Sequence, residues 1–160
     1  VLVAHAFNID KLNAFTALYN ETMLADSGLS KLEREMIAVV VSSVNKCFYC
    51  LTAHGQAVRE LSGDPILGEM LVMNYRVADL SARQRAMLDF AEKITIESHR
   101  IEESDRADLR SVGRQYRHFN TVPDEDHLRI IRFSATQFKN RLLSDREPGE
   151  TMSADVPMQC

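Results

Sequence analysis

A six-residue apolar run, Met36 to Val41, places the strongest constraint on how this chain can fold. Ser30 and Glu33 precede it with the spacing of a capping box, in which a hydroxyl and a carboxylate each accept a hydrogen bond from a backbone N–H. The spacing predicts a helix that opens at Ser30 and becomes apolar on every side, as a helix in the centre of a fold does. A strand is the alternative for the six apolar residues, but the capping box and the length of the pattern favour a helix.

The rest of the chain shows apolar residues at helical spacing and no convincing strand, so we expect an all-α domain of about six to seven helices. Beyond Ser144 the periodicity fails, which predicts a single domain over residues 1–144 and a flexible tail over residues 145–160. Three further helices are expected before residue 80: from Asp10 to Met23, from Cys47 to about Leu61, and, after an Asp64-Pro65 cap, from Ile66 to about Tyr75. The next helix follows the Ser81-x-x-Gln84 cap, with a buried stripe of Met87, Leu88, Phe90, Ala91 and Ile94. The last two run from after Ser104 to near Gly113 and from Val122 to about Leu142.

The charge and the length of the apolar runs exclude two classes of partner. The net charge is −4 and Lys and Arg occur singly, so we expect no nucleic-acid binding. No apolar run approaches the roughly 20 residues that cross a bilayer, so we expect no membrane partner. Three cysteines are too few for a disulfide scaffold, and we find no signal peptide in the sequence. We therefore expect the protein to be located in the cytoplasm, where cysteines stay reduced. The first residue is Val1 rather than Met, which leaves room for a targeting segment upstream.

Cys47, Cys50 and His54 form the group of residues with the clearest chemical potential. Their spacings of three and four place them within roughly 60° of one another on one helix face. In the first helical turn, the helix dipole would lower the pKa of the Cys47 thiol and so favour its thiolate form. Cys50 would lie within reach of His54. Such a pair can react with an oxidant at one sulfur and resolve the sulfenic acid with the other.

Glu35 is the next candidate because it shares a helix stripe with Leu32, Val39 and Ser42, which are apolar or small. Its carboxylate is therefore expected to be partly buried, where a carboxyl group can exchange protons near neutral pH. Glu33 already has a structural role in the capping box, whereas Glu35 has none.

Glu35, Cys47-x-x-Cys50 and His54 together resemble the motif of the alkylhydroperoxidase D (AhpD)-like proteins of the carboxymuconolactone decarboxylase superfamily. Including Ser43, Asn45 and Tyr49, the string is similar to the peroxidase-related branch of that superfamily. Two later segments, Leu80 to Ala91 and Phe138-x-Asn140-Arg141, support the resemblance. The resemblance covers about residues 13–144 in all.

The resemblance implies an all-helical homo-oligomer, a trimer or hexamer, that reduces organic hydroperoxides or hydrogen peroxide without a cofactor or a metal. It implies that Cys50 attacks the peroxide, that Cys47 is the more exposed resolving cysteine, and that His54 and Glu35 relay protons. A dithiol or a protein would supply the electrons. Ser43, Asn45 and Tyr49 would support the site. Tyr49 stands where the founding peroxidases carry a second histidine, and residues 111–123 differ from the short turn typical of the family.

Other interpretations of these residues stay open. The two cysteines are alternatively buried thiols that pack as small hydrophobes, or zinc ligands together with His54 and Glu35. A non-catalytic redox sensor or binding protein is the main alternative function, and a lactone decarboxylase is a weaker one, because that branch does not depend on a Cys-x-x-Cys pair. The remaining histidines have no carboxylate or cysteine at a motif spacing and are expected to have surface or capping positions: His5, His99, His118 and His127. The third cysteine, Cys160, lies in the tail and is expected to take no part in the chemistry.

Overall fold

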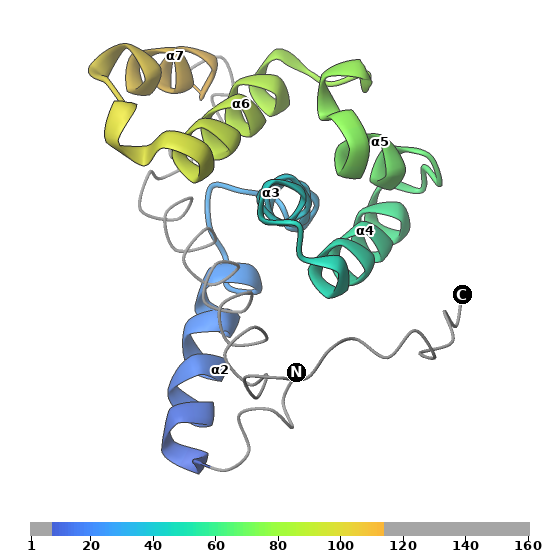
Figure 1. Cartoon of the computed structure of the whole chain (residues 1–160), viewed down its shortest axis with the longest axis vertical. Coiled ribbons are helices and arrows are strands. Elements are labelled where there is room, and N and C mark those ends of the chain that lie inside the picture. The colour runs from blue at the N-terminus through green and yellow to red at the C-terminus, as the bar shows by residue number, and fades with distance from the viewer. Residues whose placement is uncertain (1–7, 114–160) are drawn as a thin grey trace, which may run out of the picture.

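The computed structural model describes residues 8–113 (Figure 1), and every regular element in that range is helical, which confirms the predicted all-α class. The predicted last helix from Val122, the tail from residue 145, Cys160 and three of the histidines lie outside the described residues. The elements are α2 (Ile9–Met23), α3 (Lys31–Asn45), α4 (Phe48–Ser62), α5 (Leu67–Asn74), the 3-10 helix η1 (Tyr75–Val77), α6 (Ala82–Glu97), the 3-10 helix η2 (Ser98–Arg100) and α7 (Glu103–Gly113).

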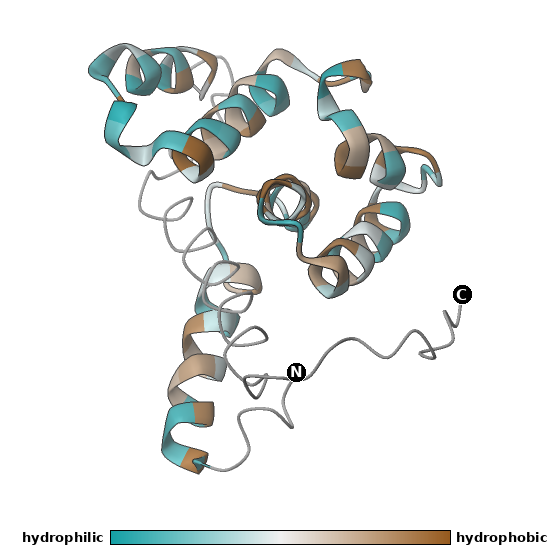
Figure 2. Cartoon of the chain, in the orientation of Figure 1, coloured by the Kyte–Doolittle hydropathy of each residue, from teal (hydrophilic) through white to brown (hydrophobic). Residues whose placement is uncertain are grey.

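Helix α3 runs through the centre of the described fold. Figure 1 shows it end-on, with α4, α5 and α6 arranged around it, and these three helices all contact it. Hydrophobic residues line it in Figure 2, and the predicted apolar run from Met36 to Val41 is buried throughout. The strand alternative for this run is therefore wrong, because all six residues lie inside one continuous helix.

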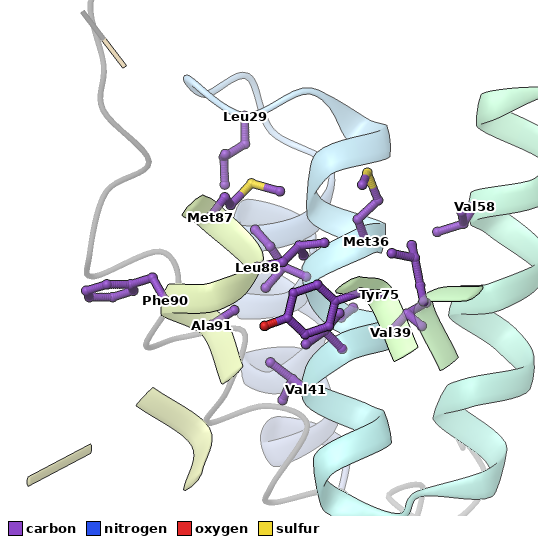
Figure 3. Packing of buried hydrophobic residues seen from close by; sticks show 14 of the residues in the cluster. Leu29, Met36, Val39, Val41, Val58, Tyr75, Met87, Leu88, Phe90 and Ala91 are labelled. Atoms are coloured by element: carbon purple, nitrogen blue, oxygen red, sulfur yellow. The ribbon is translucent and has the colours of Figure 1, made fainter. Parts of the chain in front are cut away.

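The core packs around this helix as the hydrophobic spacing predicts (Figure 3). Met87 and Leu88 of α6 are fully buried in the same cluster as Met36 and Val39 of α3. Phe90, Ala91 and Ile94 of α6 are buried as well, so the whole predicted stripe of this helix lies in the core.

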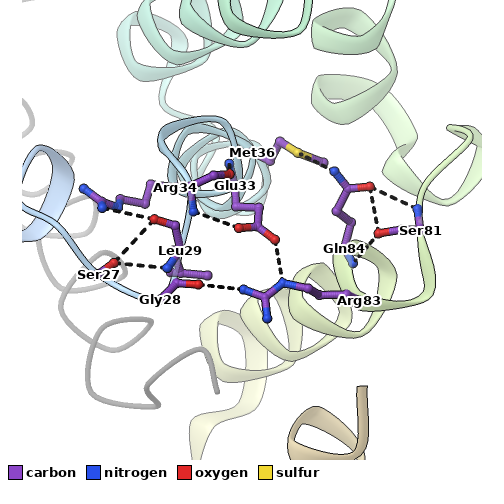
Figure 4. Close-up of polar contacts among 10 residues, drawn as sticks. Ser27, Gly28, Leu29, Glu33, Arg34, Met36, Ser81, Arg83 and Gln84 are labelled. Atoms are coloured by element: carbon purple, nitrogen blue, oxygen red, sulfur yellow. Dashed lines mark hydrogen bonds and ion pairs between the residues drawn. The ribbon is translucent and has the colours of Figure 1, made fainter. Parts of the chain in front are cut away.

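Both predicted capping boxes are present (Figure 4). At the start of α3, the Glu33 N–H donates to Ser30 Oγ at 3.1 Å, and the Ser30 N–H donates to Glu33 Oε2 at 2.8 Å. The second oxygen of the same Glu33 carboxylate accepts a hydrogen bond from Arg83 Nε of α6 at 2.7 Å. Glu33 therefore caps one helix and ties it to another, which fixes the N-terminal end of α3.

Several predicted helix starts differ from the structure by one or two residues. Asp64 Oδ1 accepts a hydrogen bond from the Ile66 N–H at 2.8 Å, which closes a turn, so α5 begins only at Leu67 and ends at Asn74. A side-chain turn of this kind competes with helix formation. Helix α7 begins at Glu103, one residue before Ser104, and ends at Gly113 as predicted.

Helix α2 projects away from the helices around α3 (Figure 1). Only its C-terminal end is fully buried, at Thr22 and Met23, while Tyr19 packs on the core from the turn before. This end of α2 is the part that can approach the helices carrying the candidate residues.

Candidate active site

The connection between α3 and α4 sets the position of the cysteine pair. Lys46 ends α3 in the left-handed conformation, with φ 58° and ψ 34°, and its N–H donates to the carbonyl oxygens of Ser42 and Ser43. The Cys47 N–H also donates to the Ser42 carbonyl oxygen, at 3.1 Å. These bonds satisfy the last carbonyls of α3 and reverse the chain, so that α4 starts immediately after Cys47.

The cysteine pair lies at the start of α4, as predicted, but Cys47 is the N-cap of the helix and not a residue of its first turn. The helix starts one residue later than predicted because Lys46 and Cys47 are occupied in closing α3. An N-cap side chain normally accepts hydrogen bonds from the N–H groups two and three residues on, but the Cys47 side chain makes no such bond in the disulfide form. The reduced sulfur of Cys47 therefore lies at a position where a negative charge is stabilised by the helix start.

Cys47 and Cys50 are joined as a disulfide, with their Cα atoms 5.4 Å apart. This pairing shows that the two sulfurs come together on one helix end, as redox chemistry requires. The exposed fractions of the two residues are 5% and 6%. Exposure in this oxidised form therefore does not distinguish Cys47 from Cys50, although the family resemblance implied a more exposed Cys47.

Glu35 and His54 meet across the α3–α4 contact. His54 Nδ1 lies 2.6 Å from Glu35 Oε2, and the side chains are 21% and 14% exposed. Glu35 is thus partly buried, as its stripe on the helix predicted. With Nδ1 held by the carboxylate, Nε2 is the ring nitrogen left to exchange a proton with another group.

Tyr19 of α2 is a neighbour that the sequence did not reveal. Burial raises the pKa of Tyr19, and the charge of Glu35 and the Tyr49 phenol raise this pKa further, so the Tyr19 hydroxyl stays protonated at neutral pH. The sequence placed Tyr19 only in the apolar stripe of its helix. No local signal could have linked it to Glu35, because the two residues lie on different helices.

The residues expected to support the site have different positions. Tyr49 is half-exposed beside the cysteines, and Asn45 is the last residue of α3. Ser43 Oγ donates to the Val72 carbonyl oxygen at 2.6 Å and so ties α3 to α5. Ser43 also lines a cavity of about 70 Å³ that includes none of Cys47, Cys50, His54 and Glu35. Its role in this structure is packing between helices.

The zinc alternative gains no support from the described part of the chain. Within residues 8–113, no three His, Cys, Asp or Glu side chains are grouped so that they could hold a metal ion. His99, the one other histidine in this range, is exposed in η2, as predicted.

None of the helices within residues 8–113 is long and apolar enough to span a membrane.

Comparison with known proteins places this chain in a family. The sequence profile of the carboxymuconolactone decarboxylase family matches residues 10–93, which is more than half of the chain. No curated protein matches the chain.

Two solved structures share the fold. An uncharacterized peroxidase-related protein from Silicibacter sp. TM1040 is 62% identical, with a TM-score of 0.79 over 89% of this chain and 71% of that one. A structure described as the alkylhydroperoxidase AhpD core, an uncharacterized peroxidase-related protein from Ralstonia eutropha JMP134, is 37% identical, with a TM-score of 0.76 over 87% and 70%. The chain therefore belongs to the carboxymuconolactone decarboxylase family, among its AhpD-like, peroxidase-related proteins.

Proposed function

We propose that this protein is a thiol-dependent peroxidase that reduces organic hydroperoxides or hydrogen peroxide through Cys47 and Cys50. The observation that carries the proposal is the Cys47–Cys50 disulfide at the start of α4, on the helix that also holds His54 against Glu35 at 2.6 Å. A redox pair and a proton-exchanging pair on adjoining helices supply the two functions that peroxide reduction needs. The peroxidase-related descriptions of both similar structures agree with this choice.

In the first step, the Cys50 thiolate attacks one peroxide oxygen, so that an S–O bond forms and the O–O bond breaks. The attacked oxygen stays on the sulfur with its hydrogen, and the other oxygen leaves with the electron pair of the O–O bond as an alkoxide, or as hydroxide from hydrogen peroxide. His54, paired with Glu35, donates the proton that converts this leaving group to an alcohol or water. Cys50 is left as a sulfenic acid.

In the second step, the Cys47 thiolate attacks the sulfur of the Cys50 sulfenic acid. The S–S bond forms and hydroxide leaves, taking up a proton to become water. The Cys47–Cys50 disulfide supports this step, because it is the bond that the step would form. An external dithiol then reduces it by two successive exchanges, which return two electrons and two protons to the cysteines.

Cysteine variants test this assignment. We expect Cys50→Ser to abolish peroxide consumption, and Cys47→Ser to consume one equivalent and accumulate a sulfenic acid on Cys50 that dimedone traps for mass spectrometry. Cys160→Ser is the matched control and should retain the rate. A Cys50→Ser variant with the full rate would refute the proposal.

The same residues also suit a redox sensor, since the disulfide alone is a two-state switch. A sensor would consume peroxide in proportion to its dithiol and then stop, whichever reductant is supplied. The family name suggests a lactone decarboxylase as a further candidate, but that reaction gives no role to the disulfide found here.

A further inference from the structure

Lys46 holds an unusual backbone conformation directly before the cysteine pair. Within residues 8–113 it is the one residue other than glycine with a positive φ, at 58°. Residues other than glycine and asparagine are disfavoured in this conformation, because Cβ approaches the following carbonyl oxygen. Helix α4 ends in the same conformation at Gly63, with φ 70°, so this chain uses glycine at the equivalent position of the next helix. Lysine at residue 46 therefore reduces stability at a place where glycine would not.

The side chain of Lys46 is exposed, and no carboxylate pairs with it in the part of the chain that the structure describes. Among the described residues, the other titratable groups of the candidate site are Glu35 of α3, His54 and Tyr49 of α4, and Tyr19 of α2. Glu35 and His54 pair with each other, and burial raises the pKa of Tyr19, so its hydroxyl stays neutral near pH 7. Within residues 8–113, Lys46 is thus the charged group of this site that no group of opposite charge balances, and it directly precedes Cys47 in the chain.

We propose that Lys46 occupies this strained position because its ammonium group favours the thiolate form of Cys47 in the reduced protein. It acts through Cys47 and is a positioning residue, not a catalytic one. The inference rests on the proposed function, in which the Cys47 thiolate resolves the Cys50 sulfenic acid. For an exposed unit charge several ångströms away, Coulomb's law in water gives about a threefold change in the thiolate-to-thiol ratio.

Four variants separate the charge from the backbone conformation. Lys46→Gly and Lys46→Asn remove the charge and suit a positive φ, whereas Lys46→Arg keeps both the charge and the strain. Lys31→Gln removes a charge from an exposed lysine at the opposite end of α3, fifteen residues away, and serves as the control.

The experiment measures the rate of Cys47 alkylation by iodoacetamide against pH in the fully reduced protein, with Cys47, Cys50 and Cys160 resolved by peptide mass spectrometry. We expect the profiles of the Gly and Asn variants to move to higher pH, with about threefold slower alkylation below the midpoint, and those of the Arg and Lys31→Gln variants to stay in place. We also expect the Gly variant to melt roughly 2–4 °C higher, because the backbone strain is relieved.

A Lys46→Asn profile that coincides with the wild-type profile would overturn the proposal, and so would a Gly variant that melts no higher than the wild type. No peroxide is used in either measurement. A lack of peroxide turnover would therefore count against the proposed function and leave this inference to be judged on its own data.

Discussion

At the scale of single residues, the central observation is that Glu35 and His54 lie 19 positions apart in the chain and 2.6 Å apart in the structure. A carboxylate at this distance fixes the orientation of the imidazole ring. Both side chains are mostly shielded from water, so the charge effect between them is stronger than on an open surface.

Glu35→Gln tests the proton exchange assigned to this pair. The amide keeps the size of the side chain but neither carries the charge nor accepts a proton, so we expect the peroxide turnover number to fall by roughly 10²-fold or more. Steady-state kinetics at several pH values would measure the loss. Glu69→Gln makes the same change on an exposed carboxylate bound to Arg59, and should leave turnover unchanged. A Glu35→Gln enzyme with wild-type kinetics would remove the pair from the reaction.

At the scale of helices, α5 approaches the backbone of α4 closely because Gly68 of α5 carries no Cβ. A Cβ added at Gly68 would lie 2.8 Å from the Gly55 carbonyl oxygen and 3.2 Å from Arg59 Cγ. A Cβ added at Gly55 would meet nothing nearer than Arg59 Nη1 at 3.7 Å. Since α4 carries both cysteines and His54, this contact helps to hold the active-site helix in place.

We therefore expect Gly68→Ala to lower the free energy of unfolding by about 1–3 kcal/mol, because α5 must move away from the α4 backbone. Gly55→Ala is the matched control, and its effect should lie between neutral and a gain of about 1 kcal/mol from helix propensity. Urea denaturation of both variants measures the difference. Equal stabilities would show that the close approach is not required.

Asp105 controls how the start of α7 responds to acid. Its carboxylate accepts a hydrogen bond from the Glu102 N–H at 2.8 Å and pairs with Lys93 Nζ at 2.7 and 2.8 Å, and these contacts lower the pKa of Asp105. A carboxyl pKa that is lower in the folded state gives stability that is present above the unfolded value. That stability is lost as pH falls through the lowered folded value.

Asp105→Asn should accordingly lose about 1 kcal/mol of stability at pH 7, and the difference from the wild type should shrink as the pH falls below about 4. Thermal or urea unfolding across this pH range measures it. Asp108→Asn changes an exposed aspartate of the same helix and should have little effect at any pH. A difference that grew on acidification would contradict the sign of the argument.

The sequence predicted those features of the elements that depend on local spacing. The caps at Ser30 and Ser81 and the buried stripe around Met87 follow from residues one turn apart. The position of Cys47 as an N-cap was missed, because Lys46 is not a residue that signals a left-handed helix end. The approach of Tyr19 to Glu35 depends on how two helices pack, and single-helix periodicity carries no information about that.

At the scale of the whole molecule, several large apolar side chains are exposed on different helices. Phe48 and Met73 are 83% and 85% exposed, and Ile9 and Val77 are also mainly in solvent. Isolated apolar residues on a surface are ordinary, but Phe48 lies between the two cysteines of the candidate active site. We propose that this protein is a homo-oligomer, a trimer or hexamer, in which such side chains are covered.

Light scattering at micromolar concentration tests the assembly. The expected mass is three or six times the 18.2 kDa of one chain. Phe48→Ser and Met73→Ser variants, compared with the wild type, would show whether either exposed side chain contributes to the contact. A mass of one chain at this concentration would contradict the proposal.

The account as a whole depends on whether the dithiol turns over. The most direct measurement is the number of organic hydroperoxide molecules reduced per protein chain, with dithiothreitol, thioredoxin and dihydrolipoamide supplied in parallel as reductants. A peroxidase should reduce many molecules per chain with at least one of these donors, and the Cys50→Ser variant should reduce none. Consumption that stops at one peroxide per dithiol with every donor would contradict the account and identify the cysteine pair as a switch.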